Sequence, residues 1–155
     1  MNLIKLTDKD MRTHGGFQWT IGEIKRAPGA GKLCTAGWLH AYEGSPELAL
    51  LLQPLHTAWA NPRVFEAIGG GRIKRDALLK IGVQRLRLVR ELPRPTISPE
   101  HCARFAILCA LSVCPYPAYR TWAINWLNGT NRSVAAAKAA VAEAAVEAWV
   151  PREGK

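Results

Sequence analysis

The sequence lacks the features that define several large classes of protein. No apolar run reaches the roughly 18 residues that a membrane-spanning helix needs. The opening residues, MNLIKLTDKDMRTH, alternate charged and apolar side chains and do not contain the continuous apolar core of a secretory signal peptide. These absences predict a cytoplasmic protein with no membrane partner.

The motifs of common enzymes are also missing. We find no G-x-S-x-G elbow, no phosphate-binding loop and no H-E-x-x-H pair. The GAGK segment at 29–32 lacks the spacing of a phosphate-binding loop, and GGGR at 69–72 does not lead into a helix as a dinucleotide fold requires. We therefore expect both segments to be turns, and we expect no catalytic residue and no cofactor.

Cysteines are few, and none forms a C-x-x-C pair that would indicate a redox or zinc motif. Three of them lie in one apolar helical stretch, where we expect them to behave as small hydrophobic residues. The spacing of Cys34, His40 and His56 matches no standard zinc pattern, so no metal site is predicted. The four cysteines are Cys34, Cys102, Cys109 and Cys114.

Acidic residues are scarce, and the resulting charge is concentrated in one segment. The chain has 21 Lys and Arg against 12 Asp and Glu, a net charge of +9. The segment 72–94 carries a local net charge of +6 and should attract polyanions. The alternative is a solvated strand and loop that happen to be rich in arginine. The predicted binding residues are Arg72, Lys74, Arg75, Arg85, Arg87, Arg90 and Arg94.

The first part of the chain predicts short strands and one helix. Residues 16–24 alternate apolar and polar side chains, which is typical of a half-buried strand. Residues 38–42 form a second strand, in which we expect His40 to be a hydrogen-bonded core histidine. Ser45, followed by Pro46 and Glu47, predicts a helix that runs to about Gln53.

A third strand is expected at 63–68, with the triple glycine 69–71 as its turn. Residues 78–92 could be a helix, but Gly82 would weaken it. We favour a strand with a bulge near Gln84 and Arg85, because the apolar residues change phase there. In this strand Arg85 and Arg87 project together into solvent.

Beyond residue 95 the chain predicts three helices. The first is capped by Ser98 and runs to about Val113, and the second ends at Asn128-Gly129. The third spans about 131–150; its thin apolar stripe includes Val134 and Val141 among alanines, so it needs a neighbour. That neighbour is another helix or a second copy of the chain in a homodimer.

The predicted fold is α+β, a small and mainly antiparallel sheet with one crossing helix, followed by a C-terminal three-helix segment. Its two regions are 1–95 and 96–155, which we expect to form one integrated domain.

Two resemblances to known families can be drawn from motifs in the first part. Gly37, His40 and Tyr42 on one strand, followed by SPELA at 45–49 and by Glu66, loosely resemble the core of ADP-ribosyltransferase-like folds. This resemblance would imply an enzyme that uses NAD. The first-strand Arg or His and the late catalytic Glu of that family have no clear counterpart here.

The stronger resemblance is to a group of phage and prophage proteins of unknown function. It is carried by GFQWTIG at 16–22, LCTAGWLHAY at 33–42, SPELALLL at 45–52 and RVFEAI at 63–68, and it covers about the first two thirds of the chain. The resemblance implies an origin in a mobile element, with no established activity.

These observations favour binding over catalysis. The first hypothesis is a non-enzymatic protein that uses its basic surface to bind and inhibit a host nucleic-acid-guided defence complex, in the manner of an anti-CRISPR protein. Its partner would be a host protein or ribonucleoprotein complex in the host cytoplasm. The alternatives are a phage DNA- or RNA-binding protein and an ADP-ribosyltransferase-like enzyme.

Overall fold

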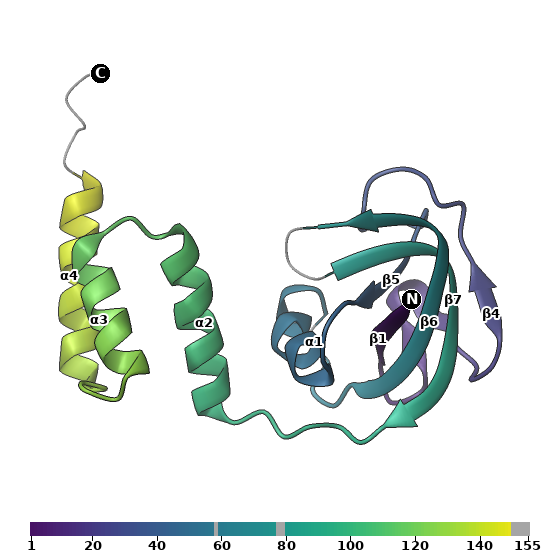
Figure 1. The fold of residues 1–155 in the computed structure, drawn as a ribbon, viewed down its shortest axis with the longest axis horizontal. Coiled ribbons are helices and arrows are strands. Elements are labelled where there is room, and N and C mark those ends of the chain that lie inside the picture. The colour runs from purple at the N-terminus through teal and green to yellow at the C-terminus, as the bar shows by residue number, and fades with distance from the viewer. Residues whose placement is uncertain (58, 77–79, 150–155) are drawn as a thin grey trace. The chain divides into compact units, whose positions relative to one another are not determined.

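The computed structural model describes residues 1–57, 59–76 and 80–149. The chain divides into two compact units, Met1–Ile97 and Ser98–Lys155. Within the described residues, the strands all lie in the first unit and the second unit consists of three helices (Figure 1). The fold is therefore α+β, as predicted, whereas the prediction of one integrated domain stays a prediction. Among the described residues, no helix has the length and apolar content needed to cross a membrane.

The first unit is built mainly from strands. It begins with β1 (Asn2–Thr7), β2 (Arg12–Thr13), a 3-10 turn η1 (His14–Gly16), β3 (Phe17–Gln18), β4 (Ile24–Arg26) and β5 (Leu39–Tyr42). Helix α1 (Pro46–Leu52) and a second 3-10 turn, η2 (Gln53–Leu55), connect β5 to β6 (Arg63–Arg75) and β7 (Lys80–Leu92). Ser45 accepts the Leu48 N–H and Pro46 begins α1, so the predicted crossing helix is confirmed.

The main sheet closes on itself. Its strand order is β4-β7-β5-β1-β6, and β6 also pairs with β7 along both long strands (Figure 1). All these strand pairs are antiparallel. Alternate side chains of each strand therefore point to a common interior. The fully buried side chains include Phe65, Leu3, Ile81, Leu86 and Leu88.

The predicted strand at 78–92 is confirmed over residues 80–92 as β7, whereas positions 78 and 79 lie outside the described residues. The phase change of its apolar residues is also present. Ile81 and Val83 are buried, as are Leu86 and Leu88, while Arg85 is exposed between them. The register of β6 against β7 shifts between Gly70 and Ile73, opposite Gln84. At this position the extra residue therefore lies in β6, and not in β7 where the sequence suggested it. A second register shift, between Glu66 and Ala67, leaves Val89 of β7 without a partner, so β7 has an extra residue farther along the strand.

The triple glycine is not a turn, so that prediction was wrong. β6 continues through 69–71 to Arg75. Gly71 has a φ of 78° and lies at the bulge, where a residue with a side chain would be strained. Glycine supplies the same backbone freedom to a bulge as to a turn, which is why the sequence alone did not separate them.

The predicted strand at 16–24 was also wrong, because the chain bends within it. Residues 17–18 belong to β3, which pairs with β2, and residues 24–26 belong to β4, which pairs with β7. Trp19 lies between them with 2% of its surface exposed and belongs to the main core. The alternation of this segment reflects one deeply buried indole rather than a continuous strand.

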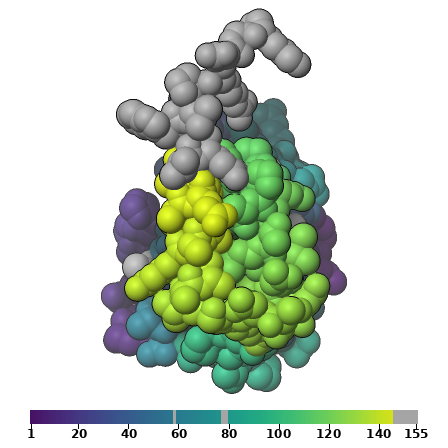
Figure 2. All heavy atoms as spheres, turned by 90° about the vertical axis from the view of Figure 1, so that its left-hand side faces the viewer, coloured from purple at the N-terminus to yellow at the C-terminus, as the bar shows by residue number. Residues whose placement is uncertain are grey.

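The second unit contains α2 (Pro99–Val113), α3 (Pro117–Leu127) and α4 (Val134–Trp149), close to the predicted bounds. Position 150, the predicted end of the third helix, lies outside the described residues. Ser98 and His101 form a capping box at the start of α2. The atoms of α4, drawn in yellow, lie against those of α3, drawn in green (Figure 2).

Two expectations about side chains in this unit were wrong. The residues buried between the helices include Ala123 and Ala140, whereas Val134 and Val141 of the predicted apolar stripe are exposed. Cys102 and Cys109 are exposed rather than packed as small hydrophobic residues. Small alanines let α3 and α4 approach closely, so the larger side chains are left outside the contact.

Candidate functional site

All seven predicted binding residues are exposed, on β6, β7 and the segment that follows β7. Arg85 and Arg87 lie two residues apart on the outer side of β7, as predicted. Strand pairing adds one residue that the sequence did not indicate, because Arg26 of β4 is the register partner of Arg85. Arg72 lies in the β6 bulge opposite Gln84. We call Arg26, Arg72, Arg85 and Arg87 the arginine face.

The arginine face differs from the remaining predicted binding residues in whether the side chains have partners within the protein. Among the described residues, no ion pair or side-chain hydrogen bond engages the guanidinium groups of Arg26, Arg72, Arg85 and Arg87. The remaining four residues already have partners within the protein. These contacts are Arg75–Glu43 at 2.9 Å, Arg90–Glu66 at 2.7 Å, Arg94 to Asn61 Oδ1 at 3.0 Å and Lys74 to the Gly31 carbonyl at 2.9 Å.

Apolar side chains are exposed beside these arginines. Ile24 of β4 and Ile68 of β6 are both register partners of Arg87. Their exposed fractions are 52% and 39%, respectively. The face therefore offers cations together with apolar contact area, a combination that suits a polyanion with exposed bases or an acidic protein surface.

A cavity in the same unit was not predicted. It has a volume of about 870 Å³. Its wall includes the aromatic side chains of Phe17, Trp19, Trp38, Tyr42 and Trp59. None of the described residues that line it is Asp or Glu. Its cationic and imidazole side chains are Lys5, His14, Arg26, His40, His56 and Lys80.

Lys5 is a cation inside the sheet. It lies on β1 in the same phase as buried Leu3, and only 7% of its surface is exposed. Its Nζ donates a hydrogen bond to the His40 carbonyl at 2.5 Å and lies 4.8 Å from the centre of the Trp19 ring. Burial, together with the charge of Lys80, lowers the pKa of Lys5 from 10.5 to about 7.

Lys80, which lies in the basic segment 72–94, is a second buried cation at this cavity. It is 8% exposed, and its Nζ lies 3.0 Å from Cys34 Sγ. Cys34 has a φ of 68°, a conformation that is uncommon for a residue other than glycine. Asp76 accepts the backbone N–H of Lys80 at 3.1 Å and does not line the cavity.

Both imidazoles that the sequence considered as metal ligands have protein partners. His40 Nε2 accepts the backbone N–H of Cys34 at 3.0 Å, and His56 Nδ1 lies 2.9 Å from the Tyr42 hydroxyl. Burial, with the charges of Lys80 and Lys5, lowers the pKa of His40 to about 4, so this ring is neutral at pH 7. Burial raises the pKa of Tyr42 to about 12. The described residues contain no group of three side chains able to hold a metal ion.

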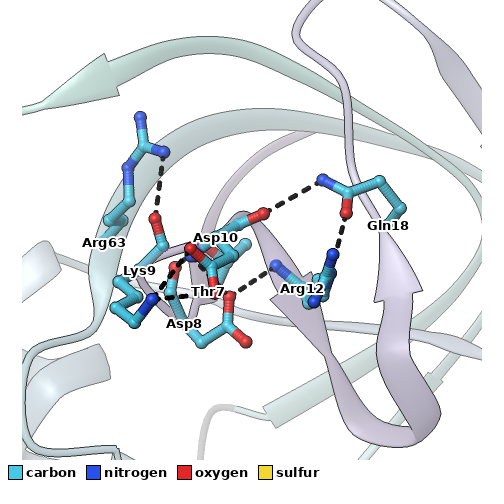
Figure 3. A network of polar contacts seen from close by, with 7 residues as sticks. All are labelled: Thr7, Asp8, Lys9, Asp10, Arg12, Gln18 and Arg63. Carbon is cyan, nitrogen blue, oxygen red and sulfur yellow. Dashed lines mark hydrogen bonds and ion pairs between the residues drawn. The ribbon is translucent and has the colours of Figure 1, made fainter.

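A polar network around Asp8 and Gln18 holds the short strands β2 and β3 (Figure 3). Phe17 of β3 and the adjoining Trp19 line the cavity. The Asp8 carboxylate accepts the backbone N–H of Arg12 at 2.7 Å, and the Gln18 amide joins β3 back to this turn. Trp19 then donates its indole N–H to Thr13 Oγ1 at 3.0 Å. The fixed hairpin therefore orients the aromatic wall next to Lys5.

The cavity brings together only some residues of the ADP-ribosyltransferase resemblance, since Tyr42 and His40 line it and Glu66 does not. Glu66 is bound by Arg90 on the surface. His14 also lines the cavity.

The comparison with protein families identifies the first unit. Residues 1–99 match the model of a domain of unknown function (DUF7666). The chain belongs to this family. The match includes the whole of the sheet, the arginine face and the cavity, so both candidate sites lie in the family domain. No curated protein and no solved structure matches the chain.

Sequence reasoning missed Arg26, Lys5 and Lys80 for a shared reason. Their placement depends on which strands pair and on the closure of the sheet, which are contacts between distant segments. One local signal was present, since Lys5 has the same strand phase as Leu3 within the apolar segment NLIKLT.

Proposed function

We propose that the chain is a non-enzymatic binding protein of a mobile element, and that its arginine face binds nucleic acid held in a host nucleic-acid-guided defence complex. The observation that carries the proposal is the set of guanidinium groups on β4, β6 and β7 without an acidic partner among the described residues. Guanidinium groups bind phosphate through paired hydrogen bonds, and the exposed isoleucines add apolar contact for bases. The step to a defence complex is supported by the resemblance to phage proteins.

The first test measures binding of fluorescently labelled single-stranded RNA by anisotropy. Replacing Arg85 and Arg87 by Gln should weaken binding at least about tenfold, because two phosphate contacts are lost. The control variant is Lys9→Gln with Lys32→Gln, which removes two charges from exposed positions elsewhere in the unit and should bind nearly as the wild type does. Equal loss in both variants would mean that only net charge matters, and would overturn the assignment of the face.

The second test addresses the partner. A reconstituted guide RNA–nuclease complex should cleave its target more slowly when the protein is present, and the Arg85→Gln/Arg87→Gln variant should not slow it. Unchanged cleavage together with tight binding of bare RNA would instead support the alternative, a phage protein that binds DNA or RNA directly.

The enzyme alternative makes a separate prediction. We expect no release of nicotinamide from NAD, because Glu66 is bound by Arg90 and is not positioned with His40 at the cavity. Release that disappears in a folded Glu66→Gln variant would contradict the non-enzymatic proposal.

A further inference from the structure

The ammonium groups of the two buried lysines at the cavity, Lys5 and Lys80, have fewer hydrogen-bond acceptors among the described residues than they have N–H donors. An ammonium group has three N–H donors. Among the described residues, Lys5 Nζ has one hydrogen-bond acceptor, the His40 carbonyl, and Lys80 Nζ has one weak acceptor, the Cys34 sulfur. The ion pairs of the described residues include neither lysine. Burying a cation without a counter-charge is costly, so an anion in the cavity would be stabilised.

The remainder of the wall indicates what kind of anion fits. A volume of about 870 Å³ is of the size that holds a small organic molecule rather than a bare ion. Trp19 and Trp38 line it and provide flat apolar surfaces. The Trp38 indole is fixed by a hydrogen bond from Nε1 to the Gly31 carbonyl, and that of Trp19 by its bond to Thr13, so the surfaces are preformed.

We propose that this cavity binds a small organic anion, a phosphate or carboxylate group carried on a flat ring, with the anionic group held by Lys5 and Lys80. The ring lies against the aromatic wall. Such a ligand supplies acceptors to both ammonium groups and covers the exposed parts of the wall. The site is distinct from the proposed nucleic-acid surface, except that Arg26 belongs to both.

The test uses isothermal titration calorimetry with the full chain and four probes at about pH 6.5. These are adenosine 5′-monophosphate, adenosine as its neutral match, indole-3-acetate as a carboxylate on a flat ring, and inorganic phosphate. At least one of the two ring-bearing anions should bind with a Kd below about 1 mM. Adenosine and inorganic phosphate should each bind at least about tenfold more weakly than that anion.

Substitutions of single lysines and of the arginine pair test where the anion binds. Lys80→Gln should weaken binding of the preferred anion at least about tenfold, whereas Lys9→Gln, the matched change at an exposed lysine, should leave it unchanged. The Arg85→Gln/Arg87→Gln variant should also leave it unchanged, which separates a failure of this site from a failure of the proposed nucleic-acid surface.

A second measurement does not depend on whether Lys80→Gln folds. Cys34 lines the cavity and Cys102 is exposed in the other unit, so alkylation can be followed at both by mass spectrometry. The bound anion should slow alkylation of Cys34 and not of Cys102. The proposal is overturned if no ring-bearing anion binds, if adenosine or phosphate binds as well as the preferred anion, or if Cys34 is not protected by an anion that binds.

Discussion

Lys5 lies in an environment that is unusual for a lysine, because its side chain is buried. Its ammonium group lies inside a closed sheet, next to Lys80 and beneath the His40 carbonyl. A charged group in such a place lowers the free energy of unfolding, because it is solvated only in the unfolded chain. Because the ammonium group can lose its proton, this decrease in the free energy of unfolding depends on pH.

We expect Lys5→Met to raise the free energy of unfolding at pH 6 and to do so much less at pH 10. The folded pKa of about 7 lies below the unfolded value of 10.5, so between these values the unfolded chain binds more protons and the stability of the wild type rises with pH. At about 1.4 kcal/mol per pKa unit, the advantage of the variant should shrink by roughly 4 kcal/mol across that interval.

Urea unfolding of both proteins at several pH values measures this difference. Lys9→Met serves as the control, since Lys9 is exposed and its replacement should change the free energy of unfolding by no more than about 0.5 kcal/mol. An advantage of Lys5→Met that is the same at pH 6 and pH 10 would contradict the burial of a titrating ammonium group.

Trp38 is the second residue whose replacement is informative. It is 8% exposed, and an added Cβ at Gly82 would lie only 2.9 Å from the Trp38 Cβ, so the indole packs closely on β7. Trp38→Ala should cost roughly 3–5 kcal/mol of stability in urea unfolding. Phe17→Ala, at a side chain that is 40% exposed, should cost less. A change of only a few tenths for Trp38→Ala would show that the indole is not part of the packed wall.

At the level of a single strand, the β6 bulge makes two adjacent glycines differ in how well they should tolerate a side chain. Gly71 has a positive φ, and a Cβ there would lie 2.7 Å from Gln84 Oε1, whereas a Cβ at Gly70 would meet nothing closer than Arg85 Nη2 at 3.8 Å. Gly71→Ala should therefore cost about 1–3 kcal/mol, and Gly70→Ala should be tolerated. Thermal unfolding of the two variants checks this, and equal effects would place the bulge elsewhere.

Helix starts and the β7 strand could be predicted because their signals are local. Ser45 and Ser98 lie directly before prolines and cap their helices as expected. In β7 the phase change of the apolar residues indicated a bulge near Gln84, yet the sequence could not say that the extra residue at this position belongs to the partner strand. Which strand carries the bulge is decided by pairing across the hairpin.

The candidate sites were predictable only in part for the same reason. Arg85 and Arg87 were found because two arginines alternate with leucines on one strand. Arg26 joins them through pairing of β4 with β7, across nearly sixty residues of chain. The cavity arises where the closed sheet, the 27–38 loop and the β2–β3 hairpin meet, so no segment alone contains its pattern.

At the level of the whole chain, the family match ends at nearly the same residue as the first compact unit. The compact unit Met1–Ile97 has its own buried core, and the matched domain spans residues 1–99. We expect residues 1–97 to fold without the helices, because the core residues of the sheet all lie within this range. A cooperative thermal transition of the fragment would confirm this, and a fragment without fixed structure would contradict it.

The salt dependence of nucleic-acid binding measures whether the arginine face contacts phosphate groups. Each phosphate contact on a single strand contributes a slope of about −0.7 to a plot of log K against log salt concentration. The full chain should bind single-stranded RNA with a linear plot, and Arg85→Gln/Arg87→Gln should make the slope shallower by about 1.4, because two contacts are lost. A variant with the slope and affinity of the wild type would show that the arginine face is a solvated edge and that the partner is bound elsewhere.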